Sequence, residues 1–203
     1  MLDTLVERYR WAEQDGLVAL TISVATGRTE EEVVAAFGGA QAPRRIMTFR
    51  QIGDVLALPE AGSFHPMLIV STDSCVVTIE NTGYHGSIPE IARRASAQGG
   101  RFFSAYWDMH GDCQVMYAED GDVQVVFDPV DTRRVPAGLA VPLPRWAEGV
   151  RPDASAAGAS CLALLERVMC VRIDRDWMHK PLSAVILADP ATMFDDPEAA
   201  WRP

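Results

Sequence analysis

Apolar and polar positions alternate with a period of two along several segments in the middle of the chain. This period is typical of β-strands, whose successive side chains point to opposite faces of a sheet. It predicts strands over residues 67–71, 75–80, 101–107, 113–118 and 123–127, and an earlier strand over residues 18–24. Asp120-Gly121, the strongest short hairpin signal in the chain, separates the last two. Consecutive strands joined by short polar turns favour an antiparallel sheet.

Between the strands, apolar residues recur every three to four positions, which is the period of an amphipathic helix. The pattern predicts helices over residues 2–13, 29–37, 48–56, 87–98 and 156–171. Capping boxes predict the starts of three of them, with the pairs Thr29 and Glu32, Thr48 and Gln51, and Ser87 and Glu90. The last helix is apolar almost all round, so we expect it to be buried.

The strand predicted over residues 101–107 carries large apolar residues on both faces. Phe102 and Tyr106 share one face, and Phe103 and Trp107 share the other. An antiparallel sheet with one bare face would show polar residues on that face, so helices should cover both. We therefore predict an α+β fold, with an antiparallel sheet of about five or more strands and helices packed on its faces.

The remaining segments are less regular. Residues 39–45 fit a linker, and residues 181–188 fit either a strand or a helix. Residues 129–152 are rich in Pro, Gly and Arg, which suits an extended crossover that Trp146 could anchor. We expect a single domain over residues 1–188 and a C-terminal tail over residues 189–203.

Length and composition limit the class of protein. With 203 residues and 48% hydrophobic content, the chain can bury one sizeable core. Its first residues alternate charged and apolar side chains, unlike a signal peptide, and no apolar run approaches the roughly 20 residues that cross a bilayer. We therefore expect a cytoplasmic protein that does not interact with membranes.

Four cysteines, at positions 75, 113, 161 and 170, show no CxxC spacing. In a reducing compartment they are most simply buried hydrophobic residues. A disulfide between Cys75 and Cys113 would join two predicted strands, and the sequence leaves that pairing open.

The charge of the chain indicates its kind of partner. The formal net charge is -10 and the pI is about 4.8. A sequence-independent nucleic-acid binder needs a basic surface, so nucleic acid is disfavoured and a basic protein is the favoured partner. The sequence contains neither a GxGxxG or GxxxxGK[ST] phosphate loop nor a GxSxG nucleophile elbow, and we predict no cofactor.

Candidate chemical groups lie where the predicted strands end. Glu80 could act as a general base or bind a ligand, although capping of residues 81–83 or pairing with an arginine also explains it. His85 and His110 lie in Gly-rich loops, where an imidazole could shuttle protons or bind metal, although loop histidines are more often simply exposed to solvent.

The segment from Asp108 to Cys113 allows two interpretations. Asp108, His110 and Asp112 alternate along the chain, so in an extended loop they could face one way and bind a cation. Their spacing fits neither an EF-hand nor a paired zinc site. A turn in which Gly111 bends the chain and the aspartates accept from backbone donors is the favoured interpretation.

Three segments carry a resemblance to a known family. They read GLVALTISVATGRTEEEVVAAFGG, VVTIENTGYHG and GGRFFSAYWDMHGDCQVMYAEDGDVQVVFDP. The chain resembles, over roughly residues 17–150, a family of actinobacterial proteins defined as a domain of unknown function. The shared features are Glu80-Asn81 with Gly83, Trp107-Asp108, Asp120-Gly121 and Phe127-Asp128-Pro129. The resemblance implies no known activity.

Two classes of function remain open from the sequence. The favoured one is a noncatalytic binding or accessory protein, for example an immunity protein, that holds a protein partner with its acidic surface. Its expected binding residues are Glu80, Asn81, His85, Trp107, Asp108 and His110. The alternative is an enzyme of small-molecule or natural-product metabolism, which requires Glu80, His85, Asp108 and His110 to converge at one end of the sheet.

Overall fold

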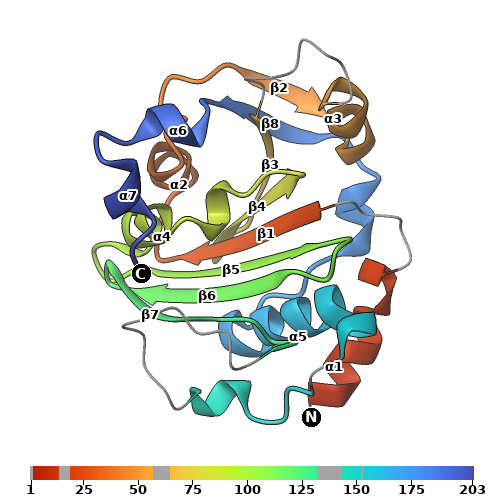
Figure 1. Cartoon of the computed structure of the whole chain (residues 1–203). Coiled ribbons are helices and arrows are strands. Elements are labelled where there is room, and N and C mark those ends of the chain that lie inside the picture. The colour runs from red at the N-terminus through yellow and green to blue at the C-terminus, as the bar shows by residue number, and fades with distance from the viewer. Residues whose placement is uncertain (1, 14–18, 57–64, 132–142, 152) are drawn as a thin grey trace.

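The computed structural model describes residues 2–13, 19–56, 65–131, 143–151 and 153–203. Within these ranges the chain forms one antiparallel sheet of eight strands (Figure 1). The strands are β1 (Ala19–Thr26), β2 (Arg44–Met47), β3 (His65–Ser71), β4 (Cys75–Asn81), β5 (Arg101–Asp108), β6 (Cys113–Glu119), β7 (Asp122–Phe127) and β8 (Leu182–Leu187). Their order across the sheet is β2-β8-β3-β4-β1-β5-β6-β7.

Strand β1 lies near the middle of the sheet and pairs with β4 on one side and β5 on the other. Its side chains divide between the two faces as a period of two requires. Leu20, Ile22 and Val24 enter one hydrophobic core, while Thr21 and Ser23 face the other way and are equally buried. The predicted α+β class with two covered faces is therefore confirmed.

The first face of the sheet is covered from both ends of the chain. Its helices include α1 (Leu2–Arg8), the 3-10 turn η1 (Arg10–Glu13) and the buried α5 (Ala157–Met169), which lie together in Figure 1. Short helices α3 (Phe49–Leu56), η4 (Arg145–Ala147), η5 (Ala154–Ala156) and η6 (Arg175–Met178) complete this side. Trp146 in η4 packs edge-on or tilted against Phe103, Tyr117 and Phe127, so it anchors its segment as expected.

The opposite face is covered by α2 (Glu30–Ala36), the short turn η3 (His85–Ser87), α4 (Pro89–Ser96), α6 (Pro190–Met193) and α7 (Pro197–Ala200). Phe37 after α2 meets Phe102 of β5 at 6.2 Å between ring centroids. The tail expected over residues 189–203 thus contains two short helices, and α7 packs on α4 through the buried Ala200. We call these helices and turns the second layer. Glu80 and His85 lie on this side of the sheet.

Local signals in the sequence were accurate where they describe hydrogen bonds between near neighbours. Two of the three predicted capping boxes, Thr29 with Glu32 and Thr48 with Gln51, form with reciprocal bonds. Asp120 and Gly121 take positive φ angles of 50° and 84°, as a two-residue hairpin turn of the primed type requires.

Other expectations were wrong where tertiary contacts decide the structure. Ser87 does not cap α4, because its hydroxyl donates to the Tyr84 carbonyl at 2.7 Å and Ile88 takes the N-cap position. The expected linker over residues 39–45 runs into the edge strand β2, which the partner strand β8 stabilises. The first helix also changes to a 3-10 turn after Arg8.

The cysteines are all free. The register explains why Cys75 and Cys113 cannot bridge: Cys75 pairs with Thr26 at one end of β1, whereas Cys113 pairs with Trp107, which faces Leu20 at the other end. In the part of the chain that the structure describes, no helix has the length and apolar character needed to cross a membrane.

Candidate functional site

Glu80 is the most buried carboxylate of the predicted site. It lies at the end of β4 opposite Thr21, so it faces the layer of η3 and α4, and it is 2% exposed. Its carboxylate accepts hydrogen bonds from the backbone N–H groups of His85 at 2.9 Å and Gly86 at 2.8 Å. The His85 ring Nδ1 lies 3.1 Å from the same carboxylate. Among the described residues, the hydrogen-bond partners of Glu80 are therefore the loop and its histidine. The sequence had favoured an arginine or residues 81–83 instead.

Two glycines allow the loop after β4 to fold back onto Glu80. A Cβ on Gly83 would lie 2.7 Å from Glu80 Oε2, and a Cβ on Gly86 would lie 2.3 Å from Ser23 Oγ. Thr21 donates to the Gly83 carbonyl at 2.7 Å and fixes the loop from the neighbouring strand. Small residues are therefore required here because backbone and carboxylate approach too closely for any side chain.

His85 is fully buried, contrary to the exposure expected of a loop histidine. Its Nδ1 faces the Glu80 carboxylate, and its Nε2 lies 3.0 Å from the carbonyl oxygen of Ala188, just after β8. Both neighbours are acceptors, and only the doubly protonated imidazolium can donate to both. Burial lowers the pKa of His85, but the hydrogen bond and charge of Glu80 outweigh burial and the pKa is raised overall. The raised pKa favours the charged imidazolium, and the buried pair ties β4 to the end of β8.

We expect stability to fall as the pH rises above neutrality, because of this pair. The folded state holds the His85 proton more tightly than the unfolded chain, since folding raises its pKa above the ordinary 6.5. The contribution is complete below about pH 6.5 and is lost as the pH rises through the folded pKa. Burial and the nearby His85 lower the pKa of His65 instead, so His65 is mostly neutral in both states above about pH 7.5 and adds little slope there.

Chemical unfolding followed from about pH 6.5 to about pH 8 measures this decline. A His85→Asn variant should be less stable than the wild type at the lower pH and should lack the decline. Both proteins contain His65, so a difference in stability between wild type and His85→Asn that stays level or grows across the range would contradict a charged His85.

The space beside this pair is small. A cavity of about 20 Å³ is lined by Leu56, His65, Pro66, Glu80, Asn81, Thr82 and Gly83. The His65 ring lies 5.3 Å from the His85 ring, measured between centroids, and meets it edge-on. A space of this size holds about one water molecule, so it does not admit a metabolite-sized substrate.

Asp108 and His110 form the turn between β5 and β6. One Asp108 carboxylate oxygen accepts from the backbone N–H groups of His110 at 2.9 Å and Asp112 at 3.1 Å. The other accepts from the Tyr106 hydroxyl at 3.1 Å; burial and this carboxylate raise the pKa of Tyr106 to about 12. His110 is exposed, and Gly111 bends the chain with φ 84°. The interpretation of this segment as a turn is confirmed.

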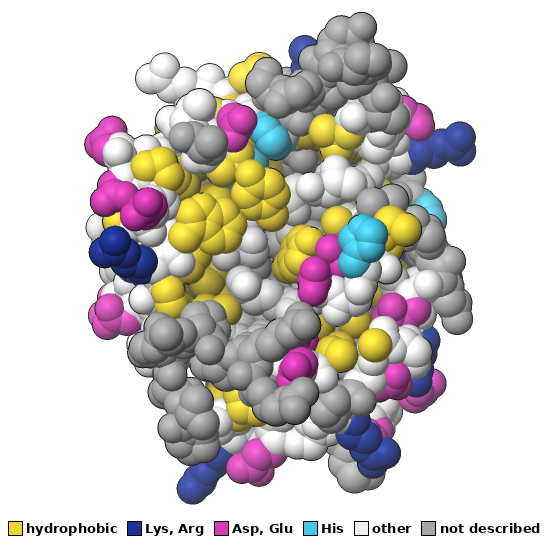
Figure 2. All heavy atoms as spheres, in the orientation of Figure 1, with side chains coloured by type: hydrophobic (Ala, Val, Ile, Leu, Met, Phe, Trp, Pro, Cys, Tyr) yellow, Lys and Arg dark blue, Asp and Glu magenta, His cyan; other side chains and the backbone are white. Residues whose placement is uncertain are grey.

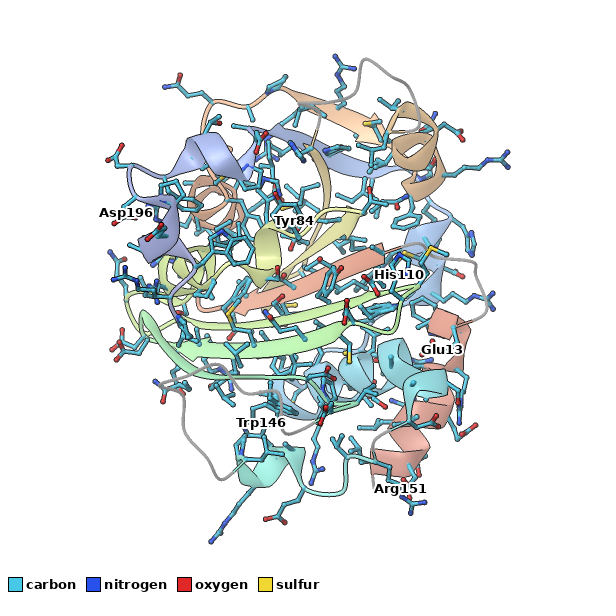
Figure 3. All side chains as sticks on the ribbon, viewed as in Figure 1. Glu13, Tyr84, His110, Trp146, Arg151 and Asp196 are labelled. Carbon is cyan, nitrogen blue, oxygen red and sulfur yellow. The ribbon has the colours of Figure 1, made fainter. Side chains whose placement is uncertain are left out.

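The Glu80 and Asp108 sites lie at the same end and on the same face of the sheet. Glu80 and Tyr106 both pair with Thr21, and Asp108 pairs with Ala19, so β1 separates the two carboxylates. Two strand spacings alone amount to about 10 Å. Figure 3 shows His110 at the outer end of β5 and β6, away from Tyr84 in the loop after β4. Within the described ranges, no three His, Cys, Asp or Glu side chains group as metal ligands.

Two other predicted residues have structural environments of their own. Trp107 faces the opposite core, is 3% exposed, and packs so closely on α5 that a Cβ on Gly158 would lie 2.5 Å from its indole nitrogen. Asn81 donates from its side chain to the Phe49 carbonyl at 3.2 Å and links β4 to α3. Trp107 therefore does not join the polar site, because its position in β5 places it on the other face.

An exposed aromatic pair that the sequence analysis missed lies directly above His85. Tyr84 stacks on the His85 ring at 6.1 Å between centroids, and Trp201, after α7, stacks on Tyr84 at 6.0 Å. Tyr84 is 39% exposed and Trp201 is 48% exposed. Figure 2 shows hydrophobic side chains gathered on this part of the surface, with acidic side chains and a basic one along its outer edge. We call Tyr84 and Trp201 together the aromatic platform.

Comparisons with known proteins return nothing: no protein-family model, no curated protein and no solved structure matches the chain. The resemblance to an actinobacterial family stays a prediction. The function must therefore be inferred from the geometry described above.

Proposed function

We propose that this chain is a noncatalytic binding or accessory protein, as an immunity protein is, and that it holds a basic protein partner. The observation that carries the proposal is that the Glu80–His85 pair is buried and bonded within the protein. Every contact of the Glu80 carboxylate and of both His85 ring nitrogens named above is made inside the protein. A general base must reach the proton that it removes, and this pair is sealed from solvent.

The charge of the chain supports a basic partner. The net charge of -10 creates a negative potential that speeds the encounter with a positively charged protein and repels nucleic acid. Several carboxylates on the second layer are exposed, for example Asp195, Asp196 and Glu198. Charged groups at a surface favour association more than they favour the fold.

The alternative, an enzyme of small-molecule metabolism, receives less support. Its four proposed residues, Glu80, His85, Asp108 and His110, lie at one end of the sheet, as this alternative requires. The cavity beside Glu80 holds about one water molecule, however, and Asp108 is engaged in its own turn. We therefore keep binding as the proposal.

Affinity capture tests the proposal. The purified chain would be immobilised and exposed to nuclease-treated lysate of its source organism at about 50 and about 150 mM salt, since surface attraction weakens with ionic strength. An unrelated protein of equal net charge is the control. We expect one basic protein to be enriched over the control, and its purified form to give a stoichiometric complex by calorimetry. Failure to enrich any protein at either salt concentration would contradict the proposal.

A further inference from the structure

Hydrogen bonds from neighbouring residues hold the backbone at both residues of the aromatic platform. Ser87 bonds the Tyr84 carbonyl with both its N–H at 3.0 Å and its hydroxyl at 2.7 Å. Trp201 follows the buried Ala200, and Arg93 of α4 donates to the Arg202 carbonyl at 2.9 Å. The backbone beside both aromatic residues is thus held, and their rings stack on each other, so a ligand would lose little free energy in ordering them.

Charged side chains border this platform, and the carboxylates outnumber the arginines, which are Arg93 and Arg94 of α4 and Arg202. Residues 189–203 carry four acidic side chains, Asp189, Asp195, Asp196 and Glu198, and a single basic one, Arg202. Burial, then the charges of Asp189 and Glu80, raise the pKa of Tyr84, so negative charge acts directly on this ring. Figure 3 shows Asp196 on the outer side of α7, beyond the layer that carries the platform. An apolar surface with an acidic border selects cationic ligands over neutral ones.

We infer that the aromatic platform is the docking site for an arginine-bearing segment of the partner. This inference rests on the proposed function and specifies its surface. A guanidinium group stacks flat on tyrosine or tryptophan and donates to carboxylates in its own plane, and the platform with its acidic border offers both interactions. A lysine ammonium makes the first contact but lacks the planar set of donors, so it should bind more weakly.

A second copy of the chain is a poor occupant of the same surface. Two copies would bring two strongly acidic surfaces together, and like charges across an interface oppose binding. A purely apolar segment would leave the acidic border without partners. The charge of the surroundings therefore argues for a cationic segment.

Nuclear magnetic resonance titration with short capped peptides tests the inference on the free protein. The probes are Gly-Arg-Gly-Arg-Gly and its lysine and glutamate counterparts at equal ionic strength. We expect the arginine peptide to shift the Trp201 indole signal saturably and the glutamate peptide to leave it unchanged. The other indoles, at Trp11, Trp107, Trp146 and Trp177, serve as internal references and should not move.

Protein variants show which residues the peptide-induced shifts depend on. Trp201→Ala should abolish the saturable shifts of the backbone signals of residues 83–87, while Ile46→Ala, an exposed residue on edge strand β2, should leave them intact. Combined Asp195→Asn, Asp196→Asn and Glu198→Gln changes should weaken binding about three- to tenfold, because each exposed ion pair contributes little. Asn keeps the N-cap bond that Asp196 makes to Ala199 at 3.0 Å, so α7 should persist.

Three outcomes would overturn the inference. They are shifts spread over the whole acidic surface, equal shifts with the glutamate peptide, and self-association through Trp201 detected by sedimentation. Binding of the captured partner to the Trp201→Ala variant distinguishes failure of this inference from failure of the proposed function. If that partner binds Trp201→Ala as tightly as wild type, the chain is still a binding protein but the platform is not its docking site.

Discussion

Replacing Glu80 with alanine should lower the free energy of unfolding by about 3–5 kcal/mol, the largest effect that we expect from a single polar substitution. The change would remove the carboxylate that raises the pKa of His85, so burial would favour the neutral ring and the charged pair would be lost. It would also leave the backbone N–H groups of His85 and Gly86 without their acceptor. Denaturant unfolding near pH 7 measures the loss.

Two comparisons make this result specific. Glu80→Gln keeps the shape but places an amide donor against backbone donors, so it should cost less than alanine but clearly more than zero, about 1–3 kcal/mol. Asp54→Ala, an exposed carboxylate on α3, should change stability by about 0.5 kcal/mol or less. If Glu80→Ala cost no more than Asp54→Ala, the pair would not support the loop.

Replacing Gly86 with alanine should cost about 1–3 kcal/mol, because the loop has no room for a methyl group. The new Cβ would lie 2.3 Å from Ser23 Oγ, 3.0 Å from Thr21 Cγ2 and 3.2 Å from Glu80 Oε1. These atoms belong to central strands or to the buried ion pair, so they cannot move aside cheaply.

Ser23 supplies the matched test. Its buried hydroxyl has no hydrogen-bond partner within the described residues, so Ser23→Ala alone should be neutral or slightly stabilising. The same change removes the closest clash, and the double variant with Gly86→Ala should recover part of the lost stability. Additive effects in this double-mutant cycle would contradict the close approach of loop and strand.

Sequence patterns predicted the fold well because the signals were local. Alternation identified β4 to β7, and capping residues marked α2 and α3 correctly. The covered second face followed from the two apolar faces of β5. Strands β2 and β8 were harder to predict because one is a short edge strand and the other is ambiguous in pattern; each is defined by pairing with a distant segment.

The candidate site was predictable only in part, for a physical reason. Glu80 and His85 were identified, but their burial and their partners depend on Ala188, a residue far along the chain. Tyr84 and Trp201 likewise meet only because α7 packs on α4. No periodicity within the sequence encodes such contacts. A Gly-rich loop with an aromatic residue, GYHG, was the one local signal that could have drawn attention to Tyr84.

The central claim is that Glu80 and His85 form a buried, charged pair that holds the loop after β4, and that they do not act as a catalytic acid and base. The most direct measurement is nitrogen nuclear magnetic resonance of the His85 ring in the wild-type protein at about pH 7, near the ordinary histidine pKa. The account predicts protons on both Nδ1 and Nε2, both protected from exchange with solvent. A neutral ring that titrates near 6.5 and exchanges freely with water would contradict it.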